Sequence, residues 1–137
     1  MSAALTPARD LAAALNRAAA REIVVLGFYT SHSCPWCVAV RREQLEPRLR
    51  ANDPPKIAII EFDADSDAVF TLPDGRRQTA RQWAHGLGFR LTPTLAALDR
   101  TAKPIVSPLV GYSSKDFYGA YLEEQIRQAQ RYWQNQR

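Results

Sequence analysis

The only two cysteines in the chain, Cys34 and Cys37, lie three positions apart within residues 31–40, SHSCPWCVAV. Two thiols at this spacing can form a redox pair, supply half of a metal site, or be two buried residues that happen to be close. A small secreted protein held together by disulfides carries about four to eight cysteines, so this pair is no disulfide framework. The spacing therefore points to redox chemistry, catalysis or metal binding.

The sequence around the pair predicts a strand that leads into the motif and a helix that follows it. Residues 22–30, EIVVLGFYT, form a short apolar run rich in β-branched and aromatic side chains, which is typical of a buried strand. The helical spacing of apolar residues begins at Cys34, and Pro47 should kink or shorten this helix.

This placement gives the two cysteines different exposure and reactivity. Cys34 lies at a helix N-terminus, where unpaired N–H groups and the helix dipole favour a thiolate. Cys37 lies one turn further in and should be more buried. We therefore expect Cys34 to attack or be attacked and Cys37 to resolve the mixed disulfide.

The rest of the chain reads as an α/β domain over residues 1–137. The pattern predicts a helix from Thr6-Pro7, strands over 22–30 and 56–63, a turn at 72–75, a helix from Thr79 to about His85, strands over 94–99 and 104–111, and a helix from Ser113 to about Trp133. The early β-α-β order predicts parallel strands, and the late strand pair an antiparallel edge. We expect a central mixed sheet of about four strands flanked by helices, with an N-terminal helix and a short insert before the third helix.

The last helix should begin with a capping box formed by Ser113 and Asp116. Its predicted core stripe is Phe117, Tyr121, Leu122 and Ile126.

The CPWC motif at a strand–helix junction, with LTPT far downstream at 91–94, resembles the thioredoxin superfamily. The resemblance covers residues 23 to about 126 and implies a thioredoxin-like three-layer fold. It also implies that Pro93 is a cis-proline against the motif and that the backbone of Thr92 pairs with an extended substrate. The implied substrate groove consists of Pro35, Trp36, Thr92 and Pro93.

Residues 70–117 resemble a particular subgroup of this superfamily. The features that carry the resemblance are a turn-containing insert, the TPT motif and the pair Gly111-Tyr112. These residues are similar to thioredoxin-like proteins of bacterial periplasms, including those encoded with sulfur-oxidation systems. This similarity implies a periplasmic reductase of protein disulfides that receives electrons from a membrane or soluble thiol donor. The first ten residues do not have the basic and apolar pattern of a secretory signal, so the alternatives are a cytoplasmic protein or a mature chain.

Two positions depart from ordinary thioredoxins. Ser33 stands where they carry tryptophan, and the strand before the motif has Phe28 or a neighbour in place of a buried acid. In those relatives the carboxylate helps to deprotonate the buried cysteine. Cys37 would then need another base, such as water or the substrate.

A metal site would need more ligands than the two cysteines. His32 lies only two residues before Cys34, and His85 falls in a separate predicted helix, so neither has zinc-finger spacing. A c-type haem is excluded because Val38 rather than histidine follows the motif. His32 could instead favour the Cys34 thiolate as an imidazolium, or be an exposed loop residue.

Composition argues against several other classes of protein. The net charge is +4, but the arginines are scattered in runs of at most two, which indicates a solvated surface rather than a nucleic-acid site. The longest apolar run, 23–29, is far shorter than the ~20 residues of a membrane span. We expect a monomer with no cofactor, no metal and no stable membrane insertion.

The sequence thus predicts a thiol–disulfide oxidoreductase that reduces protein disulfides through a Cys34-linked mixed disulfide resolved by Cys37. Two alternatives remain open: a thiol oxidase or isomerase on the same scaffold, and a non-catalytic module that binds metal or a partner and senses redox state.

Overall fold

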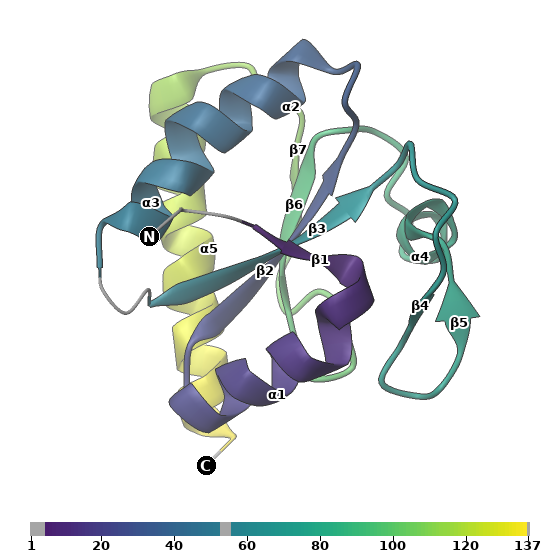
Figure 1. Cartoon of the computed structure of the whole chain (residues 1–137). Helices are drawn as coiled ribbons and strands as arrows, with labels where there is room; N and C mark the ends of the chain where they lie inside the picture. Colours follow the sequence, from purple (N-terminus) through teal and green to yellow (C-terminus); the bar gives the residue numbers. More distant parts are fainter. Residues whose placement is uncertain (1–4, 53–55, 137) are drawn as a thin grey trace.

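The computed structural model describes residues 5–52 and 56–136 and consists of a five-stranded sheet between two layers of helices (Figure 1). The elements are β1 (Thr6–Pro7), η1 (Ala8–Asp10), α1 (Leu11–Arg21), β2 (Val24–Thr30), α2 (Pro35–Val40), η2 (Arg41–Leu45), α3 (Glu46–Arg50), β3 (Ile57–Asp63), β4 (Phe70–Thr71), β5 (Arg77–Gln78), α4 (Ala80–Gly86), β6 (Thr94–Leu98), β7 (Leu109–Val110) and α5 (Lys115–Asn135). The α/β class predicted from the sequence is confirmed.

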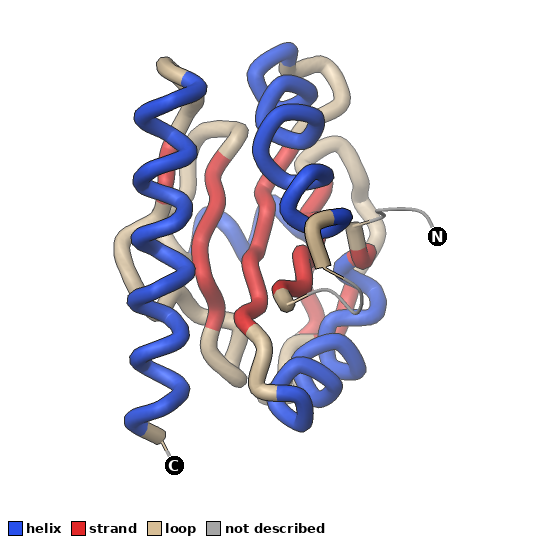
Figure 2. Tube along the Cα trace, turned by 90° about the vertical axis from the view of Figure 1, so that its left-hand side faces the viewer, coloured by secondary structure: helices blue, strands red, loops and turns tan. Residues whose placement is uncertain are grey.

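The strand order in the sheet is β1-β3-β2-β6-β7. β2 pairs in parallel with β3, and β6 pairs antiparallel with β7, as the order of the elements predicts. β2 also pairs antiparallel with β6, which the sequence did not predict. The segments α2, η2, α3 and α5 cover one face and α1 and α4 the other; Figure 2 looks onto the first face, with α5 on the left. Because both faces are covered, every residue of β2 is buried, which explains its continuous apolar run.

The sheet gains a fifth strand where the sequence predicted the start of a helix. Thr6 and Pro7 pair in parallel with Ile60 and Glu61 of β3, and the helix α1 begins only at Leu11. Threonine followed by proline suits a helix start, but an edge strand tolerates proline equally well because one side of it needs no N–H donor. The free edge of β3 therefore decides the outcome.

The last helix also begins one residue later than predicted. Ser114, not Ser113, is its N-cap, and its side chain accepts the N–H of Phe117 at 3.4 Å. Phe117 and Tyr121 are exposed, at 70% and 62%, so their assignment to the core was wrong. The buried face comprises Tyr118, Leu122, Gln125, Ile126 and Ala129. This helix has apolar residues on more than one side, and packing against β6 selects the face that is buried.

Pro47 changes the helix of the cysteine motif without ending it. Between α2 and α3 the chain forms the π-helical segment η2, in which the N–H of Glu46 donates to the carbonyl of Arg41. Proline has no N–H to donate to the carbonyl four residues earlier, so the wider turn lies where the regular bonding pattern is interrupted. The predicted kink is thus realised as a π-helical turn.

The predicted insert is a hairpin that packs beside α4. β4 and β5 pair antiparallel around a turn in which the N–H of Gly75 donates to the carbonyl of Leu72 at 2.9 Å. Thr79 then caps α4 in a capping box with Gln82. Both features agree with the sequence prediction.

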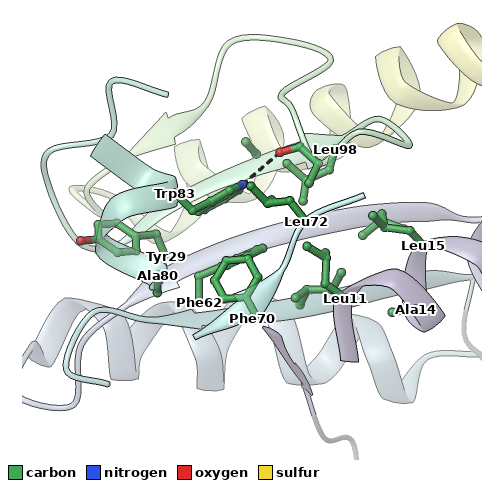
Figure 3. Packing of buried hydrophobic residues seen from close by; sticks show 14 of the residues in the cluster. Leu11, Ala14, Leu15, Tyr29, Phe62, Phe70, Leu72, Ala80, Trp83 and Leu98 are labelled. Carbon is green, nitrogen blue, oxygen red and sulfur yellow. Dashed lines mark hydrogen bonds between the residues drawn. The ribbon is translucent and has the colours of Figure 1, made fainter. Parts of the chain in front are cut away.

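A layer of aromatic side chains fastens this region to the sheet (Figure 3). The indole of Trp83 on α4 stacks on Phe62 of β3 with ring centroids 3.7 Å apart, and Phe70 meets the edge of the same stack. The indole N–H donates to the carbonyl of Ala102 at 3.1 Å, which satisfies its one polar group. A separate core cluster, which includes Cys37, lies on the opposite face of the sheet.

Gly27, in the middle of β2, has no room for a side chain. A Cβ there would lie 2.9 Å from Leu98 Cδ1 and 3.2 Å from Phe62 Cε2, both in fully buried side chains. We expect Gly27→Ala to lower the free energy of unfolding by about 1–3 kcal/mol, measured by urea denaturation. Gly86→Ala is the matched control, because its Cβ meets nothing within 4 Å. Equal urea midpoints for the two variants would contradict this account.

Candidate active site

Cys34 is the N-cap of α2, immediately beyond the loop that leaves β2. Its backbone is extended, and its Sγ accepts the N–H of Cys37 at 3.1 Å. Pro35 occupies the first helical position, where its missing N–H costs nothing. The N–H of Cys37 also donates to the Cys34 carbonyl at 3.1 Å, so it is shared between that oxygen and the sulfur. An N–H of the first helical turn directed at a sulfur is a contact of the kind that favours a thiolate.

Cys37 lies behind Cys34 and is only 1% exposed, whereas Cys34 is partly exposed. Burial raises the pKa of Cys37, and its interaction with Cys34 raises it further. Hydrogen bonds from the hydroxyl groups of Thr30 and Thr92 and from the backbone of Ser31 act in the opposite direction and favour the thiolate. Since the raising causes dominate, Cys37 remains a neutral thiol at neutral pH.

The loop before β6 brings Thr92 and Pro93 to the cysteines from 58 residues away in sequence. The Thr92–Pro93 peptide bond is cis, and the Cys34 thiol donates to the carbonyl of Thr92 at 3.7 Å. The carbonyl of Pro93 accepts the N–H of Gly111 at 2.9 Å, and the Thr94 hydroxyl donates to the carbonyl of Leu91 at 2.6 Å. These bonds hold the loop against the motif.

Trp36 is 61% exposed between the two cysteines. Leu91, in the loop that carries Thr92, is equally exposed. The site thus presents apolar surface on both of the segments that meet at Cys34.

His32 is paired with an acid of β3. Its Nε2 lies 2.9 Å from Asp63 Oδ2, and its side chain is largely exposed. Within 5–52 and 56–136, no three histidine, cysteine or acidic side chains cluster closely enough to hold a metal ion. His85 lies on α4, which covers the face of the sheet opposite to α2.

The strand before the motif carries a buried apolar side chain, and none of the described carboxylates is buried. Phe28 on β2 is fully buried, and the guanidinium of Arg41 lies 5.7 Å from its ring centroid. Arg41 also forms an ion pair of 2.9 Å with Glu61 of β3. A cation therefore lies over the ring at this position, and its partner carboxylate belongs to the neighbouring strand.

Sequence reasoning missed the carboxylates of Asp63 and Asp65, which hydrogen-bond the loop before the motif. A signal was present: the acidic stretch DADSD, residues 63–67, follows a strand predicted to be parallel to β2. The carboxyl ends of parallel neighbours lie at the same edge of a sheet, so these acids had to lie close to the motif.

The fold and the site together define a class of protein: a dithiol pair at the start of the helix after a central strand, faced by a cis-proline loop. Residues 11–126 match the family model described as a thioredoxin-like domain, and the chain belongs to this family. The family and the Cys34-x-x-Cys37 arrangement support thiol–disulfide oxidoreductase chemistry at this general level.

Solved structures agree with this fold. Thioredoxin O2 of Arabidopsis thaliana is 16% identical, with 90% of this chain and 96% of that chain covered and a TM-score of 0.58. Trxlp of Edwardsiella tarda is 18% identical, with 87% of this chain and 98% of that chain covered and a TM-score of 0.59. A redox protein of Chlamydomonas reinhardtii is 20% identical, with 92% of this chain but 36% of that chain covered and a TM-score of 0.63. No curated protein sequence matches the chain. None of the helices in the described parts of the chain has the length and apolar character needed to span a bilayer.

The unequal burial of the two thiols predicts their order of reaction. In the reduced protein at pH 7, iodoacetamide should modify Cys34 at least about ten times faster than Cys37, because a neutral, buried thiol is inert. Modification of Cys37 should rise only above the pH at which an ordinary thiol ionises, since its pKa is raised. Mass spectrometry of Cys34→Ser and Cys37→Ser variants measures each rate alone, and equal rates at pH 7 would refute the assignment.

Proposed function

We propose that this protein reduces disulfide bonds in other proteins, with Cys34 as the nucleophile and Cys37 as the resolving thiol. The observation that carries the proposal is the Cys34 sulfur, which is partly exposed and accepts the N–H of Cys37 at 3.1 Å, directly in front of a buried second thiol. A partly exposed sulfur can meet a protein disulfide, whereas the buried one can meet only Cys34.

The reaction proceeds in two exchanges. The Cys34 thiolate attacks one sulfur of the substrate disulfide, so that the substrate S–S bond breaks, a Cys34–substrate disulfide forms and a substrate thiolate leaves and takes up a proton. Cys37 then loses its proton to solvent and attacks Cys34, so that the Cys34–substrate bond breaks, a Cys34–Cys37 disulfide forms and the second substrate thiolate leaves and takes up a proton. The substrate gains two electrons and the Cys34–Cys37 pair loses them. A membrane-bound or soluble thiol donor must reduce the pair again.

The apolar surface around Cys34 suits a protein substrate. We infer that Pro35 and Trp36 contact the substrate on one side of the sulfur and Thr92 and Pro93 on the other. In this arrangement the backbone of Thr92 pairs with an extended segment of substrate. A periplasmic location is supported by the sequence resemblance over residues 70–117 and belongs to the same proposal.

The second exchange should depend on pH in a particular direction. Its rate follows the thiolate fraction of Cys37, whose pKa is raised by burial. Phe28 on the preceding strand is fully buried, and none of the described carboxylates is buried where it could remove this proton. Resolution of the mixed disulfide should therefore accelerate as pH rises above neutral.

Trapping experiments test the assignment of the two cysteines. Cys37→Ser should accumulate mixed disulfides with a disulfide-bonded substrate such as insulin, because the first exchange proceeds and the second cannot. Cys34→Ser is the matched control and should accumulate none. The result is seen as a shifted band on a non-reducing gel. Absence of adducts from both variants would defeat the proposal, as would zinc retained by the wild-type protein through dialysis.

The direction of electron flow is measured separately. Titration of the Cys34–Cys37 pair in redox buffers, followed by tryptophan fluorescence, should give a potential near that of thioredoxin, about −270 mV. A potential near about −120 mV would identify a thiol oxidase on the same scaffold instead.

A further inference from the structure

A turn at the end of β3 lies against the loop that precedes the cysteine motif. The carboxylate of Asp65 accepts the Ser31 hydroxyl at 3.0 and 3.1 Å, through its two oxygens. One of these oxygens also accepts the backbone N–H of His32 at 2.7 Å. Three contacts from two consecutive residues therefore converge on one exposed carboxylate, which comes from a different strand of the sheet.

The turn that carries Asp65 is itself held in place. The N–H of Ala64 donates to the carbonyl of Thr30, the last residue of β2, at 2.8 Å. Asp63 accepts the N–H of Asp65 through Oδ1 at 2.9 Å and bonds His32 Nε2 through Oδ2 at 2.9 Å. Asp65 is thus mounted on the sheet, and the contacts with Ser31 and His32 bind the loop to it.

The bonded segment leads directly to the reactive sulfur. The carbonyl of Ser31 accepts the N–H of Cys34 at 3.3 Å, so Ser31 is the first residue of the turn that presents Cys34 to α2. Any rotation of Ser31 and His32 moves Cys34 relative to the N–H of Cys37 that its sulfur accepts.

We propose that Asp65 is a positioning residue for the nucleophile: by binding Ser31 and His32 it holds Cys34 in the orientation in which its sulfur accepts the N–H of Cys37. This inference rests on the role of Cys34 given under the proposed function. It assigns to a carboxylate outside the site a contribution to the reactivity of a thiol that it does not touch.

Charge alone would give Asp65 the opposite effect. A negative charge near Cys34 disfavours the thiolate, so its removal should make Cys34 more reactive. Loss of the hydrogen bonds should make Cys34 less reactive, because the helix N–H is then aligned with the sulfur for less of the time. The bonds from His32 and Ser31 lower the pKa of Asp65, so the carboxylate is charged throughout the neutral range. Whether Cys34 becomes less or more reactive when Asp65 is replaced therefore distinguishes a positioning role from a purely electrostatic one.

Asp67 provides a matched control in the same turn. It is an exposed acid two residues further on, and its carboxylate pairs with Arg81 of α4. Arg81 also bonds the carbonyl of Ala64. Asp67→Ala thus removes the same charge nearby and leaves the contacts with Ser31 and His32 intact.

The experiment measures the pH profile of iodoacetamide alkylation at Cys34, with Cys37→Ser as the common background. Asp65→Ala should slow alkylation at pH 7 by about three- to ten-fold and move the profile to higher pH. Ser31→Ala, which changes no charge, should shift the profile in the same direction by a smaller amount. Asp65→Asn retains one acceptor oxygen and should fall between Asp65→Ala and the unaltered background. Asp67→Ala should leave the rate unchanged or raise it.

The proposal is overturned if Asp65→Ala alkylates as fast as Asp67→Ala or faster, or if Ser31→Ala has no effect. Circular dichroism and urea denaturation verify that each variant is folded. If Asp65→Ala does not fold, Ser31→Ala carries the test, with Ser33→Ala as its control, because the Ser31 hydroxyl also lies 3.2 Å from the Ser33 hydroxyl. The outcome is separable from the proposed function, since alkylation requires no protein substrate. Slower alkylation of Asp65→Ala together with failed trapping would retain the positioning role and reject the reductase.

Discussion

The hydrogen bond from the N–H of Cys37 to the sulfur of Cys34 is the interaction on which the site depends. It exists only if Cys34 is the N-cap of α2, with the sulfur turned back over the first turn of the helix. The start of α2 is in turn set by the end of β2 at Thr30, in the middle of a sheet covered on both faces. The aromatic layer on one face of the sheet and the core cluster that includes Cys37 on the other thus fix the position of the Cys34 sulfur at the N-terminus of α2.

The carboxylates near the two thiols lie at the surface rather than in the protein interior. None of the described carboxylates is buried, and the polar groups that act on Cys37 are the Cys34 thiol, the hydroxyls of Thr30 and Thr92 and the backbone of Ser31. Carboxylates occur instead at the exposed edge of the sheet, where Asp63 and Asp65 bond the loop before Cys34. Ionised groups at the surface remain solvated, whereas a buried carboxylate must be compensated.

The sequence-based predictions failed at segments whose residues suit two different local conformations or two different buried faces equally well. Thr6 and Pro7 suit both a helix start and an edge strand, and the unpaired edge of β3 selects the strand. The last helix carries apolar side chains on two sides, and the sheet buries Tyr118 while Phe117 is left exposed. Local preferences of well under 1 kcal/mol per residue are smaller than the gain from burying one large side chain, about 1.5–3 kcal/mol.

The sequence by itself determined the α/β class, the parallel β-α-β unit, the capped helix after Thr79 and the position of Cys34 at a strand–helix junction. Each of these follows from residues adjacent in the chain, through periodicity, turn chemistry and capping. Tertiary structure alone decided the contact of Cys34 with Thr92 and the bonds of Asp65 to Ser31, which join residues 58 and 34 positions apart. Such contacts depend on the order and register of strands in the sheet, and no local pattern specifies the side-chain geometry where strand ends meet.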